Sequence, residues 1–239
     1  MRSRTYLLIV PLLSLLCLSF IVRSPFIERI YAKVESRQVQ RGKLITTRSE
    51  VCYDRNGDMV THFISPTDYV IVSNKHGEVK MYDPAKNTVI SQQNNSYSTQ
   101  TSQFYYFLSG KSTDMGLTDF GFIPTETYPE RNYIVSIWKL KVPDPQVAVQ
   151  EIKLVHQNQN PIYIDYKDGK GFILRKVFYY GYIQLNHLSF PSTATEIIYN
   201  TTTKDSTIVK TVYSDFKLNN EAKSPYFGYK IPANAKSFN

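Results

Sequence analysis

The sequence predicts a mainly β (α+β) protein, an antiparallel, half-open β-barrel of about 10–11 strands whose concave apolar face is covered by a few short helices. Three observations predict this class. Short runs of β-branched and aromatic residues recur about every 8–12 residues, with turn residues between them. The 239 residues include 19 tyrosines and 13 phenylalanines, and tyrosine suits a sheet with one wet face and one dry face. Several runs are apolar on both faces, as expected where other elements cover the sheet.

The clearest β-meander lies in residues 56–89. Its candidate strands are residues 59–64, 69–72 and 79–82. The pair Asn56-Gly57 opens the meander, and an asparagine–glycine pair favours positive φ and a tight hairpin. Further turn residues separate the strands, namely Pro66, Asn74, Gly77 and Asp83-Pro84.

The remaining strands follow the same pattern of apolar runs closed by turn residues. They are expected at residues 43–53, 133–142, 150–156, 161–166, 172–179, 182–188, 194–199, 207–216 and 227–233. Pro143 and Pro232 end two of these runs, because proline lacks the backbone donor that a sheet needs. Gly181 predicts a bulge or a bend between two of them.

Short helices are expected between the meander and the later strands. Residues 103–108 have a helical apolar face, and Gly110 follows as a stop signal. Residues 114–122 fit either a second short helix or extended chain. Both pieces are apolar and lie between strands, so residues 104–108 and 115–122 are the candidate lid over the concave face.

Two other segments are less regular. The polar residues 91–102 predict a long loop. Residues 26–34 show a weak helical pattern, with apolar side chains at i, i+3, i+4 and i+7. This segment is either the first helix of the mature protein or a spacer.

The N-terminus is typical of an export signal. Arg2 and Arg4 precede an apolar run over residues 6–22, which ends at Arg23. We expect residues 1–32 to be a signal peptide and residues 33–239 to form a single domain, which places the protein in the periplasm. An uncleaved inner-membrane anchor is the alternative, because the run is slightly short for a comfortable bilayer span.

The two cysteines predict neither lipidation nor a disulfide. Cys17 follows Leu16, where lipid attachment needs a small residue, and it lies inside the apolar run rather than at its end. Cys52 is then the only cysteine beyond the signal, so no intrachain disulfide can form. We interpret Cys52 as a half-buried structural thiol.

The residue pattern argues against an enzyme. The four histidines, His62, His76, His156 and His187, are scattered, and no pair has metal-ligand spacing. Serine-hydrolase, zinc-protease and phosphate-loop motifs are absent, so we predict no catalytic residue, no metal and no cofactor. The net charge of +8 is spread along the chain without a clustered basic stripe, so we predict no nucleic-acid binding.

Residues 57–89, GDMVTHFISPTDYVIVSNKHGEVKMYDPAKNTV, resemble a segment of the LolA-like periplasmic lipoprotein carriers. That family has a strand beginning at a glycine and ending at a proline, then an apolar strand and a glycine hairpin. Here Gly57, Pro66, Gly77 and residues 81–84 match these features. Residues 188–199 and the terminal FGYKIPANA are also similar, so the resemblance covers most of residues 43–235.

The resemblance implies an eleven-stranded, unclosed barrel that holds lipoprotein acyl chains under a helical lid. It also implies an inner-membrane transporter as donor and an outer-membrane acceptor. The chain departs from the family at Ser65, where the carriers have an arginine that holds the lid. The amphipathic first helix of the carriers is short or missing in this chain. A divergent carrier, or a relative that binds another lipid, is therefore also consistent with the sequence.

The lipid-binding side chains are expected on the apolar strands and the candidate lid. They are Val70, Val72, Met81, Phe104, Phe107, Leu108, Trp138, Leu140, Phe178 and Phe190. The sequence thus predicts a monomeric periplasmic carrier that binds acyl chains and moves them towards the outer membrane. The alternative is a membrane-anchored or periplasmic module of the same fold that binds proteins in an envelope-stress response.

Overall fold

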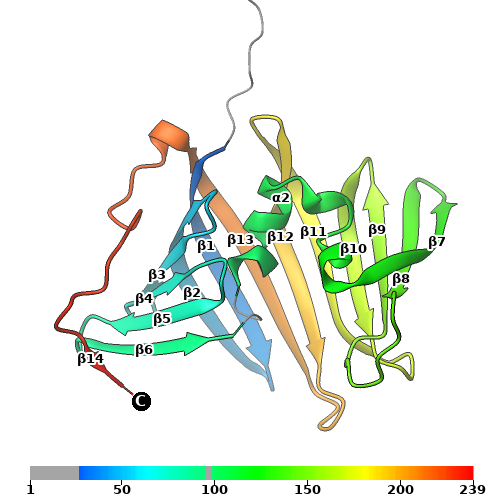
Figure 1. Ribbon diagram of the computed structural model, residues 1–239, viewed down its shortest axis with the longest axis horizontal. Helices are drawn as coiled ribbons and strands as arrows, with labels where there is room; N and C mark the ends of the chain where they lie inside the picture. Colours follow the sequence, from blue (N-terminus) through cyan, green and yellow to red (C-terminus); the bar gives the residue numbers. More distant parts are fainter. Residues whose placement is uncertain (1–26, 95–97, 239) are drawn as a thin grey trace, which may run out of the picture.

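The computed structural model describes residues 27–94 and 98–238, and its strands form one large sheet (Figure 1). The strands are β1 (Arg29–Gln40), β2 (Lys43–Asp54), β3 (Met59–Ser65), β4 (Tyr69–Ser73), β5 (Glu78–Asp83), β6 (Thr88–Gln93), β7 (Phe122–Glu130), β8 (Tyr133–Leu140), β9 (Glu151–Gln157), β10 (Asn160–Lys167), β11 (Ile173–Leu185), β12 (Leu188–Tyr199), β13 (Ser206–Leu218) and β14 (Lys236–Ser237). The mainly β, open-sheet class predicted from the sequence is confirmed, with 14 strands instead of about 10–11.

The sheet has the order β14-β6-β5-β4-β3-β2-β1-β13-β12-β11-β10-β9-β8-β7. Neighbouring strands are antiparallel, except that β14 runs parallel to β6. The pairing of β1 with β13 joins the first strands of the chain to the last long strand. The sheet does not close, because β7 and β14 remain its two edges.

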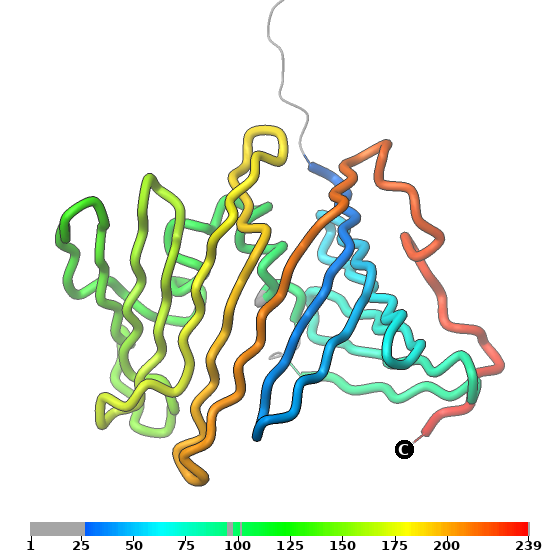
Figure 2. Tube along the Cα trace, turned by 180° about the vertical axis from the view of Figure 1, so that it is seen from behind, coloured from blue at the N-terminus to red at the C-terminus, as the bar shows by residue number. Residues whose placement is uncertain are grey.

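Short helices lie on one face of this sheet. They are η3 (Thr99–Thr101), α2 (Gln103–Leu108), η4 (Lys111–Thr113) and η5 (Leu117–Phe120), and a further turn, η6 (Asn219–Glu221), follows β13. Figure 1 shows the helical segment in front of β10–β13, and Figure 2 shows the same strands from behind. We call the face under α2 the inner face and the opposite one the outer face.

An aromatic cluster fixes the helical segment to the inner face. The ring of Phe190, which has 0% exposure, lies 5.5 Å from Phe104 and 5.6 Å from Phe107 of α2. Tyr213 and Phe216 of β13 pack on the same ring at 5.6 and 5.5 Å. These rings belong to the main core, which continues across β8–β12.

A second, smaller core lies on the outer face of β1–β4. Tyr31, Cys52, Val60 and Val70 are buried there beneath the C-terminal segment, which follows η6 (Figure 2, red). Tyr226 of this segment stacks on His62 with ring centroids 4.4 Å apart. Strands that are buried on both faces account for the runs that lack clear alternation in the sequence.

The burial of Cys52 agrees with its interpretation as a structural thiol. Its side chain is more deeply buried than expected, with 2% exposure. Burial raises the pKa of the Cys52 thiol to about 11, which disfavours the reactive thiolate at neutral pH.

Several element predictions are wrong. Residues 26–34 form no helix in the described part, because β1 begins at Arg29 and pairs with β2 and β13. The separate strands expected at 172–179 and 182–188 are one strand, β11, in which Gly181 has φ +65°. The strand expected at 227–233 is irregular, with a turn at each end of the range.

Four strands lie where the sequence predicted none, namely β1, β6, β7 and β14. β6 extends to Gln93, inside the predicted loop, and β7 follows η5 directly. The ambiguous residues 114–122 therefore form a short 3₁₀ helix that leads into an edge strand.

The predicted leader lies mostly outside the described residues. Within the described part, Ile27 is buried, and Ile30 and Ala32 each have 0% exposure in the main core. Cleavage after Ala32 would remove these side chains from the fold, and the division into residues 1–32 and 33–239 stays a prediction. None of the described helices has the length and apolar character to cross a bilayer.

Candidate functional site

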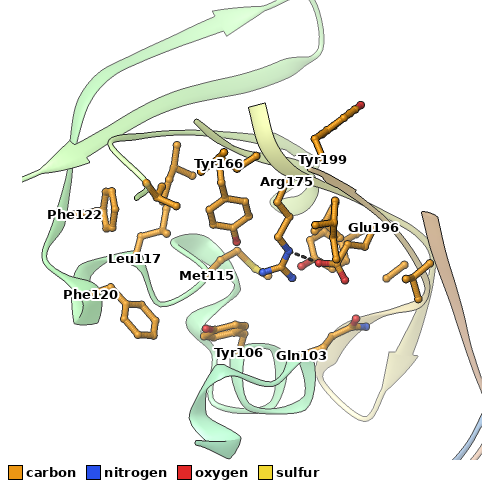
Figure 3. Close-up of a pocket in the computed structure, with 18 of the residues that line it drawn as sticks. Gln103, Tyr106, Met115, Leu117, Phe120, Phe122, Tyr166, Arg175, Glu196 and Tyr199 are labelled. Atoms are coloured by element: carbon orange, nitrogen blue, oxygen red, sulfur yellow. Dashed lines mark ion pairs between the residues drawn. The ribbon is translucent and has the colours of Figure 1, made fainter. Parts of the chain in front are cut away.

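A cavity of about 1070 Å³ lies on the inner face, between the helical segment and strands β8–β13 (Figure 3). Its wall is largely apolar. Among the lining side chains are Met115, Leu117, Phe122, Leu140, Ile152 and Val177. Its volume is at the upper end of the range for small-molecule sites, about 300–1,000 Å³.

Strand alternation decides which side chains reach the cavity from the middle of β11 and β12, whereas near the strand ends Leu174 and Tyr199 also line it beside Arg175 and Ile198. On β11, Arg175, Val177 and Tyr179 line it, and Lys176 and Phe178 therefore point to the outer face. On β12, Ala194 and Glu196 line it in the same way.

The first half of the cover is α2, which begins at a serine cap. Ser102 Oγ accepts a hydrogen bond from the Tyr105 backbone N–H at 3.2 Å, which satisfies one free donor at the helix start. The helix buries Phe104 and Phe107 in the core, and it turns Tyr106 towards the cavity.

The second half of the cover is the segment from η4 to η5. Asp114 Oδ1 accepts from the Gly116 backbone N–H at 3.0 Å, and Lys111 forms an ion pair with Asp119. Gly116 has φ +74°, and a Cβ atom here would stand 2.6 Å from Tyr106 Cε1. A glycine is therefore required where this segment crosses Tyr106.

His156 fastens this second half to the sheet. Its Nε2 lies 3.2 Å from the Ser112 carbonyl oxygen, which can only accept, so Nε2 carries the hydrogen. Burial lowers the pKa of the His156 imidazole below its usual value. The ring is therefore neutral at neutral pH in the folded protein.

We expect the free energy of unfolding to fall between pH 7 and pH 5, with His156 as one cause. The unfolded chain takes up a proton near its ordinary pKa of about 6.5, before the folded chain does, so stability is lost as the pH falls below that value. Urea unfolding at the two pH values should show a smaller loss for His156→Gln than for the parent. The exposed His76→Gln is the matched control, and an unchanged loss in His156→Gln would contradict this prediction.

Two side-chain hydrogen bonds tie the helical segment to the sheet and to the turn before β3. Thr99 Oγ1 donates to the Gly57 carbonyl at 2.6 Å, and Gln103 Nε2 donates to the Pro191 carbonyl at 3.0 Å. Ser65 lies at the end of β3, opposite Arg48 of β2.

The structure places the ten predicted lipid-binding residues in four surroundings. Leu140 lines the cavity. The adjoining core contains Phe104, Phe107, Trp138 and Phe190, with Leu108 packed against it. Met81, with 41% exposure, lies on the outlying β5. The outer-face residues are Val70, Val72 and Phe178. Lipid contact by any of the ten stays a prediction.

Sequence reasoning missed the polar part of the wall. Arg175 and Glu196 form an ion pair, and the guanidinium lies 5.2 Å from the centroid of the Tyr166 ring. Burial raises the pKa of Tyr166 and of Tyr179, so both phenols stay protonated. Period-2 alternation with Val177 could have assigned Arg175 and Tyr179 to the inner face, but a charged strand residue is typical of a solvated face.

No metal centre is indicated within the described residues. There, no group of three or more histidine, cysteine, aspartate or glutamate side chains could hold an ion.

Comparisons with known proteins identify the fold. No family model and no curated protein matches the sequence. A LolA superfamily protein from Nitrosomonas europaea is 13% identical and has a TM-score of 0.54, with 81% of this chain and 87% of that chain covered. A DUF1329 family protein from Desulfovibrio piger is 13% identical and has a TM-score of 0.58, with coverage of 86% and 91%.

A third solved structure, from Vibrio parahaemolyticus, is described as an outer membrane lipoprotein-sorting protein domain. It is 16% identical, has a TM-score of 0.54, and is matched over 82% of this chain and 87% of its own. At such low identities these likenesses establish a shared fold and nothing finer. The chain thus has the fold of LolA superfamily and DUF1329 family proteins.

Proposed function

We propose that this protein is an exported carrier that holds acyl chains, of lipoproteins or of another lipid, in the inner-face cavity. The observation that carries the proposal is a large, mainly apolar cavity beneath a helical cover. The likeness in fold to a domain described as lipoprotein-sorting supports the same class of ligand.

Burial of an acyl chain would supply enough free energy for capture. Each buried methylene contributes about 0.8 kcal/mol, so a dozen contribute roughly 10 kcal/mol before the costs of binding. Capture on this scale needs no covalent bond, metal or cofactor, and the proposal includes no catalytic step.

The two halves of the cover differ in the side chains that hold them to the sheet. α2 is fixed by Phe104 and Phe107 in the core, at 4% and 2% exposure. The η4–η5 half buries the smaller, non-aromatic side chains of Met115 and Leu117, at 4% and 3% exposure, and its one side-chain hydrogen bond to the sheet among those described joins His156 to Ser112. We propose that this half is the lid that moves when a ligand enters.

The place of action is the periplasm, with an inner-membrane transporter as donor and an outer-membrane protein as acceptor. The leader-like residues 1–32 support export, and the likeness in fold to a domain described as outer membrane lipoprotein-sorting supports the direction of transport. The carrier would act as a monomer, because one chain contains the whole cavity.

A fluorescent fatty-acid probe tests the proposal. We expect saturable binding of one probe per chain, and displacement by an unlabelled fatty acid. Protein purified from the membrane-free fraction of its host should release lipid on solvent extraction. A protein that carries no lipid and leaves the probe fluorescence unchanged would overturn the proposal.

A further inference from the structure

Two charged side chains stand in the otherwise mainly apolar and aromatic wall of the cavity. Arg175 of β11 and Glu196 of β12 are paired there, and no other described lining residue is charged at neutral pH (Figure 3). The two side chains are 47% and 27% exposed, so the pair stays in contact with water at the accessible side of the cavity, where a polar group of a ligand can reach it. A hydrocarbon chain has no group that interacts with either charge, whereas a ligand with a polar head has one.

The guanidinium of Arg175 is only partly engaged by its neighbours. Its Nε pairs with Glu196 Oε1, and its plane lies near the Tyr166 ring. Figure 3 shows its terminal Nη end pointing towards Tyr106 and Met115, inside the cavity. Because an arginine has five N–H donors and 47% of this side chain is accessible, the Nη groups can bind a ligand.

Phenol groups add further donors to the same part of the wall. Tyr106, Tyr166 and Tyr179 all line the cavity. Burial raises the pKa of each, so each keeps its O–H hydrogen at neutral pH. Each phenol oxygen can also accept, but together with Arg175 the three phenols are four groups that can donate to one anionic head.

We propose that the cavity takes an amphipathic ligand with an oxyanion head, a carboxylate or a phosphate, which binds the Nη groups of Arg175. The alkyl tail lies along Met115, Leu117 and Val177. This inference rests on the proposed carrier function and narrows it to anionic lipids, because a lipid with an uncharged head has no charge to pair with Arg175. Glu196 is the counter-ion of Arg175 in the structure, and the ligand head competes with Glu196 for the guanidinium.

Competition against an uncharged fluorescent probe, N-phenyl-1-naphthylamine, tests this inference. The competitors share one chain length and differ only in the head: laurate, dodecyl phosphate and 1-dodecanol. The parent should bind at least one anion about tenfold or more tighter than the alcohol, and the preferred anion distinguishes a fatty acid from a phospholipid-type head.

The variants separate charge recognition from packing. Arg175→Gln should abolish the preference for the anion and leave the affinity for 1-dodecanol within about twofold. Glu196→Gln should tighten the binding of the anion. Lys176→Gln is the matched control, because it removes a positive charge from the outer face of the same strand and should leave all three affinities as in the parent.

Three outcomes can be told apart. Equal affinities of the parent for the anions and the alcohol would overturn the oxyanion site and leave the carrier function standing. An equal loss of affinity for all three ligands in Arg175→Gln, with a lower melting temperature, would show that the ion pair is only structural. This result would also overturn the oxyanion site. Failure of all three ligands to displace a bound probe, or of the probe to bind, would refute the carrier function itself.

Discussion

Phe190→Ala should lower the free energy of unfolding by about 3–5 kcal/mol, because it removes the central ring of the main core. Phe190 has 0% exposure, and four aromatic rings from α2 and β13 lie around it at 5.5–5.6 Å between centroids. A cavity at this point would loosen α2 as well as the sheet, since Phe104 and Phe107 dock there. Urea unfolding followed by circular dichroism measures the loss.

Phe178→Ala is the matched control for this substitution. Phe178 has 37% exposure on the outer face of β11, where it contacts Tyr163 at 5.0 Å between centroids. We expect a loss of about 1 kcal/mol, the size of one exposed aromatic pair. Equal losses in the two variants would mean that Phe190 is not the centre of the core.

Ala194→Trp should weaken binding of the fatty-acid probe by about a hundredfold. Ala194 lines the cavity on β12, so an indole ring there occupies space that the ligand needs. Excluding about four methylenes at about 0.8 kcal/mol each costs roughly 3 kcal/mol, which corresponds to about two orders of magnitude in Kd. A fluorescence titration of the parent and the variant gives the two Kd values.

Ile197→Trp provides the control on the same strand. Ile197 pairs with Lys176 and Ile208 and therefore lies on the outer face. The Ile197→Trp substitution adds the same indole ring outside the cavity, so the Kd of this variant for the fatty-acid probe should stay within about threefold of the parent value. An Ala194→Trp variant that is folded and binds as tightly as Ile197→Trp would place the ligand elsewhere.

The strands bounded by clear turn chemistry could be predicted from the sequence. Gly57 and Pro66 bracket β3, and the predicted boundaries of β2 to β5 agree with the structure within about two residues. These strands alternate or carry β-branched runs, and their turns need glycine, proline or asparagine. Local chemistry decides such elements, so a single sequence suffices.

Elements decided by tertiary contacts could not be predicted. In β1, Ile30 packs in the main core and Tyr31 in the outer core, so burial on both faces imitates a helical spacing. β7 is an edge strand that contains Pro124 and Pro129 and is exposed beyond Phe122, so it has no alternation to detect. β14 has two residues and exists only through its pairing with β6.

The candidate site was predicted only in part, because tertiary contacts also decide which side chains form its wall. The apolar character of residues 103–108 and 115–122 identified the cover, which the structure places over the inner face. The pairing of β11 with β12 decides which side chains face that cover. It brings Arg175 and Glu196 together, although they are 21 residues apart in the sequence. No local pattern reveals such a pair.

The central claim, that an acyl chain occupies the inner-face cavity, is tested most directly by a photoactivatable version of the fatty-acid probe. Irradiation of the complex, followed by mass spectrometry at residue resolution, identifies the side chains that contact the ligand. We predict labels at Met115, Leu117 and Val177, all of which line the cavity. Labels confined to the outer face, at Val72, Phe178 or Tyr229, would contradict the claim.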